Sequence, residues 1–186
     1  LGREMRWRAS HDLLTGLLNR GEFDRRLQQV LQRSREEGTR HALLYLDLDQ
    51  FKLINDACGH PTGDRLLLQI GQLLGDCVRP GDTLARLGGD EFGVLLERCG
   101  IHQAQRIAQL ICERMEEFRF VHDGRRFRVG ASIGLVPLDA RWRQADAVMQ
   151  AADSACYVAK EAGRNRVHLW FDTDETLRQH QGQMHW

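Results

Sequence analysis

The sequence lacks an excess of charge of either sign, a long apolar run and a recognisable secretory signal. Its 186 residues include 26 basic and 26 acidic side chains, so the formal net charge is zero. Proteins that coat nucleic acid or bind membrane surfaces usually carry a basic excess, so we expect no nucleic-acid polymer as a partner. No apolar segment approaches the roughly 20 residues that span a bilayer, and the polar, basic start LGREMRWRASHD is unlike a signal peptide.

Closely spaced cysteines are also absent. The five cysteines are odd in number and scattered, and no two form a CxxC pair, which argues against a zinc cluster or a disulfide framework. We expect them to be small buried hydrophobic residues in a protein of the reducing cytoplasm. They are Cys58, Cys77, Cys99, Cys112 and Cys156. The length fits a single domain with a sizeable core.

Apolar periodicity predicts the order of the elements. Helical spacing indicates four longer helices over 20–38, 62–78, 102–118 and 144–163, and a shorter one over 50–59. Short apolar segments predict strands over 41–49, 83–87, 91–97 and 165–171, and alternation predicts a hairpin over 118–136 around Asp123–Gly124. Strands joined both by helices and by hairpins predict an α+β fold, an α/β sandwich with a central mixed or antiparallel sheet flanked by helices.

Acidic residues gather at two expected strand ends. Asp47 and Asp49 are two residues apart on one strand, so both project from one face while Leu46 and Leu48 face the core. Asp90 and Glu91 stand at the turn of ARLGGDEFGVLLE, and they approach Asp47 if the two strands are neighbours. Crowded carboxylates protonate, move apart or hold a cation. Hard oxygen ligands with open coordination positions suit Mg²⁺, which commonly binds together with substrate phosphates.

Basic and amide side chains could complete a nucleotide site. Lys160 and Arg164 are four apart where the last helix ends, so they either clamp phosphates or offset the helix dipole. Lys52 follows the first acidic strand and could join them. Asn55 and Asp64 could bind a guanine edge, or cap a turn and the helix that follows. A metal site, a phosphate clamp and polar base readers together predict a nucleotide site.

Four segments resemble one known family. GGDEF at 88–92 matches the signature of the GGDEF domain, the diguanylate cyclase family. The segments HDLLTGLLNRGEF at 11–23, DLDQFKLINDACGHPTGD at 47–64 and AKEAGRNRV at 159–167 are similar to other motifs of that family. All four occur in the family's order, from about residue 10 to about residue 170.

The resemblance implies a fold and a reaction. The fold would be like that of the polymerase palm and the nucleotide cyclases, with a ferredoxin-like core. Two GTP molecules on two facing domains of a homodimer would be joined into cyclic di-GMP, with release of pyrophosphate. Asp47, Asp90, Glu91 and the backbone carbonyl of Leu48 would bind Mg²⁺ or Mn²⁺. Asp90 or Glu91 would accept the hydroxyl proton, and the sequence does not separate the two.

The resemblance also implies substrate contacts. Gly88 and Gly89 would let the turn approach the nucleotide and would supply a positive φ. Asn55 and Asp64 would read guanine, with His60 either beside them or only part of the turn. The residues that would hold phosphates are Phe51, Lys52, Lys160 and Arg164.

A further pattern predicts regulation. Arg79 and Asp82 form an RxxD pattern five residues before the glycine pair, where the family binds its product as an inhibitor. A local ion pair is the alternative reading. Product binding at this site would hold two domains in a nonproductive arrangement.

The sequence predicts three segments. Residues 1–10 resemble the end of a signalling helix from an upstream sensor, 11–172 form the GGDEF domain, and 173–186 resemble a linker towards an EAL domain, as in an excised part of a GGDEF–EAL hybrid. This tail favours an alternative function, in which the domain binds GTP without turnover and regulates an adjacent EAL phosphodiesterase domain.

Overall fold

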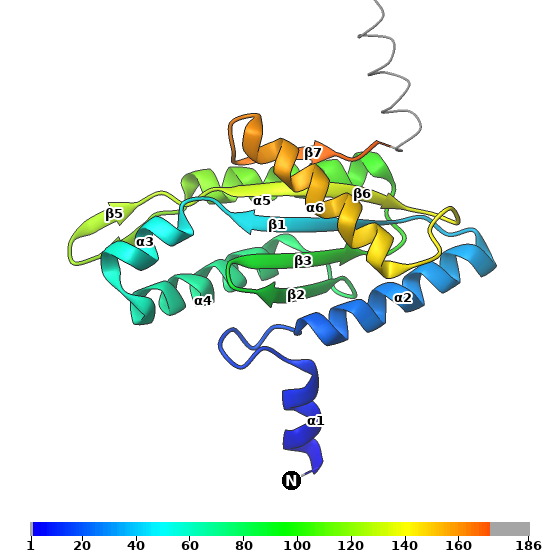
Figure 1. Cartoon of the computed structure of the whole chain (residues 1–186), viewed down its shortest axis with the longest axis horizontal. Coiled ribbons are helices and arrows are strands. Elements are labelled where there is room, and N and C mark those ends of the chain that lie inside the picture. The colour runs from blue at the N-terminus through cyan, green and yellow to red at the C-terminus, as the bar shows by residue number, and fades with distance from the viewer. Residues whose placement is uncertain (1, 172–186) are drawn as a thin grey trace, which may run out of the picture.

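The central strand β1 (His41–Leu48) organises the sheet. A computed structural model describes residues 2–171, and the predicted linker at 173–186 lies outside them. The five-stranded sheet has the order β2-β3-β1-β6-β7 (Figure 1). β1 is antiparallel to β3 and β6, and β7 is parallel to β6. The sheet is therefore mixed, as predicted, and β1, β2, β3 and β6 with their connecting helices have the ferredoxin-like order.

The predicted helices and strands form, with ends that differ by one or two residues. The helices are α1 (Gly2–Ser10), α2 (Arg20–Glu37), α3 (Phe51–Cys58), α4 (His60–Cys77), α5 (Ile101–Glu117) and α6 (Ala145–Glu161). The other strands are β2 (Thr83–Gly88), β3 (Glu91–Leu96), β4 (Phe120–His122), β5 (Arg125–Phe127), β6 (Ala131–Leu138) and β7 (Arg166–Leu169). No helix within residues 2–171 is long and apolar enough to cross a membrane.

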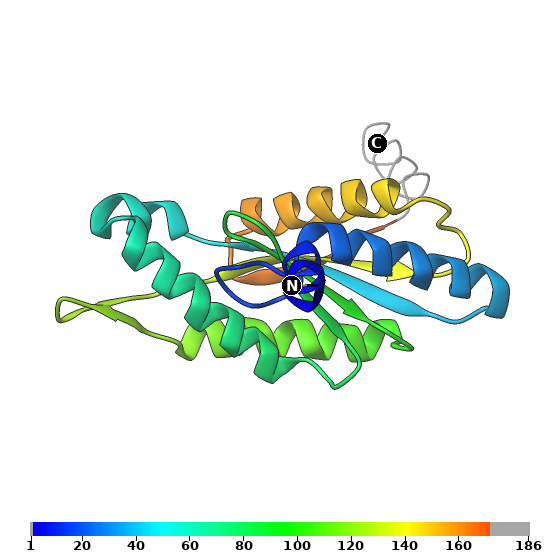
Figure 2. The same cartoon turned by 90° about the horizontal axis from the view of Figure 1, so that it is seen from below.

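Helices cover both faces of the sheet. α4 and α5 lie on one face, and α2 and α6 lie on the other (Figure 2). Successive residues of β1 point into different cores, with Leu44 and Leu46 towards α4 and α5, and Leu43 and Tyr45 towards α2 and α6. A strand buried on both faces must be apolar at nearly every position. This explains why HALLYL reads as a continuous apolar run.

The predicted hairpin over 118–136 is only partly correct. β4 and β5 pair around Asp123–Gly124 in a separate two-stranded sheet, but the chain then leaves it and β6 joins the main sheet. Ser132 and Gly134 are buried beneath α6, and a Cβ on Gly134 would clash with the Ala152 carbonyl oxygen. The alternating apolar pattern of this segment therefore arises because small residues lie under a closely packed helix, and not because one side of the strand faces solvent.

Candidate functional site

Four elements meet at one end of the sheet. The carboxyl end of β1, the β2–β3 turn, α3 and the last turn of α6 lie together there (Figure 1). Asp47 is paired in register with Glu91, and the Leu48 amide donates a hydrogen bond to the Asp90 carbonyl oxygen at 3.1 Å. The strand adjacency on which the acidic cluster depended is therefore confirmed.

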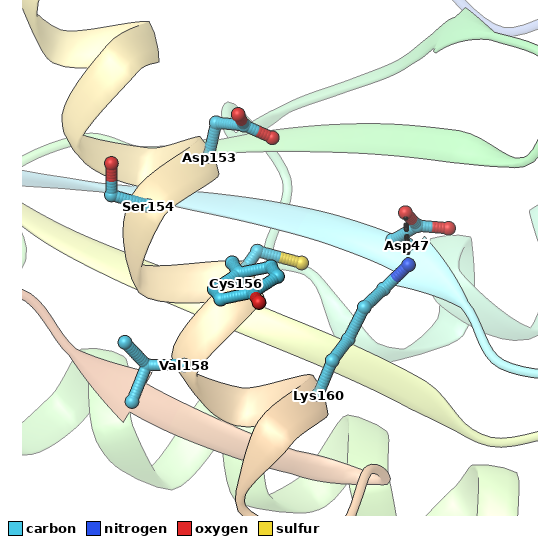
Figure 3. Close-up of a pocket in the computed structure, with 7 residues that line it drawn as sticks. Asp47, Asp153, Ser154, Cys156, Val158 and Lys160 are labelled. Carbon is cyan, nitrogen blue, oxygen red and sulfur yellow. Dashed lines mark hydrogen bonds and ion pairs between the residues drawn. The ribbon is translucent and has the colours of Figure 1, made fainter.

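Lys160 spans from α6 to the acidic strand end. Its Nζ lies 2.6 Å from Asp47 Oδ2, and the dashed line in Figure 3 marks this contact. Burial alone would lower the pKa of Lys160, but its hydrogen bond to Asp47 and the charge of that carboxylate raise it overall. The pair borders a cavity of about 440 Å³, lined by Asp47, Asp153, Ser154, Cys156, Tyr157, Val158 and Lys160.

Asp90 is half-buried at the glycine turn. Burial raises its pKa, and the neighbouring Asp47 carboxylate raises it further by repulsion. A cation between the two carboxylates would relieve that repulsion, and the Leu48 carbonyl belongs to the same strand end. Within residues 2–171, no three side chains of His, Cys, Asp or Glu are grouped to hold a metal. The Asp47 and Asp90 carboxylates and the Leu48 carbonyl are instead oxygen donors of the kind that hold a hard cation.

Glu91 has a different environment from Asp90. It lines a second cavity of about 440 Å³ between α2 and α6, together with Tyr45. Burial raises the pKa of Tyr45, and its hydrogen bond to Glu91 raises it further. Glu91 thus lies beside Tyr45, on the same face of the sheet as its register partner Asp47.

The two glycines of the turn adopt unusual backbone angles. Gly88 has φ 150° and Gly89 has φ 44°, and within residues 2–171 no atom lies within 4 Å of a Cβ built on either. Left-handed backbone, rather than crowding by the protein, is therefore what requires glycine here. The predicted close approach of a nucleotide is compatible with this open space.

Asp49 does not join the acidic cluster. Only 5% of its surface is exposed, and it accepts hydrogen bonds from Ser132 Oγ at 2.7 Å and from the Asn165 amide at 2.9 Å. Asn165 in turn accepts a hydrogen bond from the Ala131 amide at 3.1 Å. Asp49 thus anchors the turn that carries Arg164, where Arg164 and Asn165 both have positive φ. Of the two predicted acids, Asp47 therefore lies in the candidate site, whereas Asp49 has a structural role.

The α3–α4 corner carries the predicted base-reading groups. Asn55 Nδ2 lies 3.1 Å from His60 Nδ1, so the structure brings these two residues together. A Cβ on Gly63 would lie 2.3 Å from Asn55 Oδ1 and 3.3 Å from Phe51 Cζ. Gly63 therefore makes room for both side chains. Asp64, Lys52 and Arg164 are exposed on elements at the same end of the sheet.

The family resemblance implies that Asn55 reads guanine, and on that expectation Gly63→Ala should weaken GTP binding about tenfold. A displaced Asn55 would lose roughly one hydrogen bond of 1–1.5 kcal/mol. Calorimetric titration with GTP measures the change. Gly75→Ala is the matched control, since Gly75 lies on the same helix and a Cβ on it would have no neighbour within 4 Å in the described part of the chain. That control should bind GTP normally and gain stability from helix propensity. Equal GTP affinity in the two variants would contradict the role of Gly63.

The RxxD turn lies at the opposite end of β2 from the glycine turn. Arg79 Nε and Nη2 each lie 2.9 Å from an Asp82 carboxylate oxygen, and Nη2 also donates to the Glu97 carbonyl oxygen at 2.8 Å. The local ion pair, which was the alternative reading, is therefore present. One third of the Arg79 side chain remains exposed in this arrangement.

The sequence did not indicate two further sets of residues at the end of the sheet that carries the glycine turn and Lys160. Asp153 and Tyr157 line the cavity beside Lys160, and Tyr157 is 63% exposed. Their helical spacing from Lys160 was the available signal. Arg86 contacts the glycine turn through the Gly89 carbonyl oxygen, and no local pattern indicates that contact.

Comparisons with known proteins agree on one family. A family model described as "Diguanylate cyclase, GGDEF domain" matches residues 9–166. The chain is 45% identical over 168 residues to the probable diguanylate cyclase DgcE of Escherichia coli (strain K12), covering 90% of this chain and 15% of DgcE. It is 39% identical to the cyclic di-GMP phosphodiesterase PdeB of Shewanella oneidensis, covering 95% of this chain and 20% of PdeB. The chain thus spans a fifth or less of these relatives.

Solved structures are similar as well. The GGDEF domain of TpbB (YfiN) from Pseudomonas aeruginosa has a TM-score of 0.82 at 36% identity, over 91% of this chain and 99% of that one. The coiled coil and GGDEF domain of DgcB from Caulobacter crescentus, solved in complex with c-di-GMP, has a TM-score of 0.84 at 29% identity, over 90% of this chain and 88% of that one. The chain belongs to the GGDEF domain family of diguanylate cyclases.

Proposed function

We propose that this chain is a diguanylate cyclase domain that joins two GTP molecules into cyclic di-GMP. The observation that carries the proposal is the placement of Asp47 and Asp90 at adjoining strand ends, with Lys160 of α6 in contact with Asp47. In each half-reaction a 3′-hydroxyl attacks the α-phosphorus of the other GTP and loses its proton. The bond from that phosphorus to pyrophosphate breaks, so each cycle releases two pyrophosphates.

The carboxylates have two tasks in this reaction. Asp47, Asp90 and the Leu48 carbonyl would hold Mg²⁺ or Mn²⁺, and Glu91 would join them from the strand position paired with Asp47. Such a cation, when bound, stabilises charge on the phosphates and favours a 3′-alkoxide. Asp90 and Glu91 are both candidates for accepting the hydroxyl proton. The raised pKa of Asp90 brings it nearer the range of an effective general base.

The remaining groups bind the substrate. Asn55 and Asp64 would bind guanine, with His60 fixing the Asn55 amide through their contact. Lys160 would contact phosphate while staying close to Asp47. The phosphates would also contact Phe51, Lys52 and Arg164. The β2–β3 turn would approach the nucleotide closely at Gly88 and Gly89.

A second copy of the domain is needed to complete the reaction. One copy presents one set of these groups and therefore binds one GTP, so the second GTP must face it from another copy. We propose a homodimer, arranged by an upstream sensor through α1 in a longer protein.

A direct assay tests the proposal. Purified protein at several concentrations is incubated with GTP and Mg²⁺ or Mn²⁺, and cyclic di-GMP is followed by chromatography. Specific activity that rises with protein concentration, and that is lost in Asp90→Ala, supports a cyclase that works as a dimer. The absence of product even when a fused coiled coil enforces pairing would reject the cyclase.

A regulatory role is the second candidate function. The similarity to PdeB, which is named as a phosphodiesterase, favours it. In that case the domain would bind GTP without turnover and would control an adjacent EAL domain. GTP binding without product in the enforced dimer is the result that this alternative predicts.

The RxxD turn is proposed as the inhibitory product site. We expect Arg79→Ala to raise the concentration of cyclic di-GMP that halves activity at least tenfold, because a charge-assisted contact of roughly 1.5–3 kcal/mol is lost. Inhibition curves at fixed GTP measure this. Arg141→Ala is the matched control, since Arg141 forms a similar two-point pair with Asp139 on another loop. Unchanged inhibition in Arg79→Ala would place product binding elsewhere.

A further inference from the structure

Arg86 joins two segments that are far apart in the sequence. Its Nε and Nη2 donate to the Gly89 carbonyl oxygen at 3.0 and 2.9 Å, and its Nη1 donates to the Asp12 carboxylate at 3.1 Å. The Arg86 and Asp12 side chains are 17% and 20% exposed. This guanidinium therefore connects the glycine turn of the site to the turn that follows α1.

The 11–19 turn is itself tightly bonded. Asp12 also accepts hydrogen bonds from the amide and the hydroxyl of Thr15, at 2.9 and 2.7 Å. The Arg86 amide donates to the Leu18 carbonyl oxygen at 2.9 Å, which attaches the turn to β2. A shift of this turn would therefore be transmitted to Arg86.

The same turn is attached to α1. Asn19 Nδ2 donates to the Ala9 carbonyl oxygen at 2.9 Å, and the Asn19 amide donates to the Ser10 carbonyl oxygen at 2.9 Å. Asn19 also caps α2 by accepting a hydrogen bond from the Glu22 amide at 3.0 Å. These hydrogen bonds, together with the peptide bond between Leu18 and Asn19, connect the end of α1 to the glycine turn.

Glycine gives the β2–β3 turn little conformational preference of its own. Two successive glycines with positive φ can adopt several turn geometries at similar cost. Two hydrogen bonds from Arg86 fix the Gly89 carbonyl, and this carbonyl belongs to the peptide unit that leads into Asp90. The orientation of that unit determines where the Asp90 side chain begins.

We propose that Arg86 is a positioning residue that holds Asp90 in place and couples it to the turn at Asp12. Arg86 acts through the Gly89 carbonyl and touches no substrate. Movement of α1 relative to the domain changes the Asp12–Arg86 contact and, through it, the placement of Asp90. The kinetic part of this inference rests on the proposed cyclase function, and the structural coupling does not.

Steady-state kinetics give the first test. In Arg86→Ala and in Asp12→Ala we expect kcat to fall about ten- to a hundredfold while the KM for GTP stays within twofold to threefold. Arg86→Lys should not restore kcat, since an ammonium lacks the planar fork that reaches both partners. The double variant should be no worse than Arg86→Ala, because both changes break one connection. The matched control is Arg35→Ala, which removes bonds to the Trp142 and Arg143 carbonyl oxygens.

Amide hydrogen exchange gives a test that needs no turnover. In Asp12→Ala we expect faster exchange in the peptide that contains 88–91, although the change lies in another segment; Arg35→Ala should leave that peptide unchanged. Unaltered exchange at 88–91, or a loss of kcat that merely follows a loss of folded protein, would overturn the inference. A wild-type chain without cyclase activity would reject the proposed function alone, and exchange would still decide the coupling.

Discussion

Replacing Asp90 by asparagine should abolish cyclic di-GMP synthesis while making the fold more stable at neutral pH. Asparagine keeps the shape of the side chain but removes a charge that would hold a cation and a site that could accept a proton. Loss of proton transfer alone typically costs 10²- to 10⁴-fold. With the cation also weakened, we expect turnover to fall at least about a thousandfold, whereas GTP binding through Asn55 and Lys160 should persist.

The expected gain in stability follows from the raised pKa of Asp90. Burial and the charge of Asp47 raise that pKa above the usual aspartate value of about 3.9. At pH values above the folded-state pKa, the ionised Asp90 carboxylate therefore lowers the free energy of unfolding. The neutral amide of Asp90→Asn has no such cost. The advantage of Asp90→Asn should be full at neutral pH and should shrink as pH falls through the folded-state pKa. It should vanish below the unfolded-state value.

Urea unfolding of both proteins across pH, together with product assays, measures these two effects. Asp56→Asn makes the same chemical change at an exposed position on α3 and should alter neither activity nor the pH dependence. Retained turnover in Asp90→Asn would remove Asp90 from the proposed chemistry. A stability loss that is equal at all pH values would show that the ionised Asp90 carboxylate does not destabilise the folded state.

The local sequence pattern predicted the helices and strands well, because burial determines both the apolar spacing and the elements that form. The helices have one apolar face against the sheet, and β1 is apolar throughout because both of its faces are covered. The hairpin predicted over 118–136 shows where prediction from local pattern fails. Gly134 carries no hydrophobic signal, yet α6 packs on it so closely that a Cβ would meet the Ala152 carbonyl oxygen. Which strand lies beneath which helix is a property of the whole fold.

The site was predictable as a set of residues but not as a set of contacts. The Lys160–Asp47 pair joins positions 113 residues apart, and the Asn165–Asp49 hydrogen bond joins positions 116 apart. Spacing along a strand could not reveal that Asp47 faces the cavity while Asp49 anchors a turn. Similarly, Asp90 and Glu91 are adjacent in sequence, but only Glu91 lines the cavity between α2 and α6 with Tyr45.

Replacing Lys160 by alanine should weaken both GTP binding and the fold. One charge-assisted contact to phosphate contributes roughly 1.5–3 kcal/mol, which corresponds to a ten- to hundredfold loss of GTP affinity. The fold should lose about 1–3 kcal/mol, because Asp47 is only 18% exposed and keeps its charge beside Asp90 without the ammonium. Calorimetric titration and urea unfolding measure the two losses.

Arg164→Ala separates the two roles of Lys160. Arg164 is exposed on the turn that Asp49 anchors, so its removal should weaken GTP binding without destabilising the fold. If both variants were equally stable, the Asp47–Lys160 pair would have no structural value.

Divalent metal offers a way to rescue the Lys160 variant. A cation between Asp47 and Asp90 supplies the positive charge that the ammonium provided, so Mn²⁺ should raise the unfolding temperature of Lys160→Ala more than that of the wild type. Adding Asp47→Asn to Lys160→Ala removes one of the two carboxylates and should abolish this extra shift. An equal shift in all three proteins would mean that Mn²⁺ binds elsewhere, and the ammonium and the cation would then not share the Asp47 carboxylate.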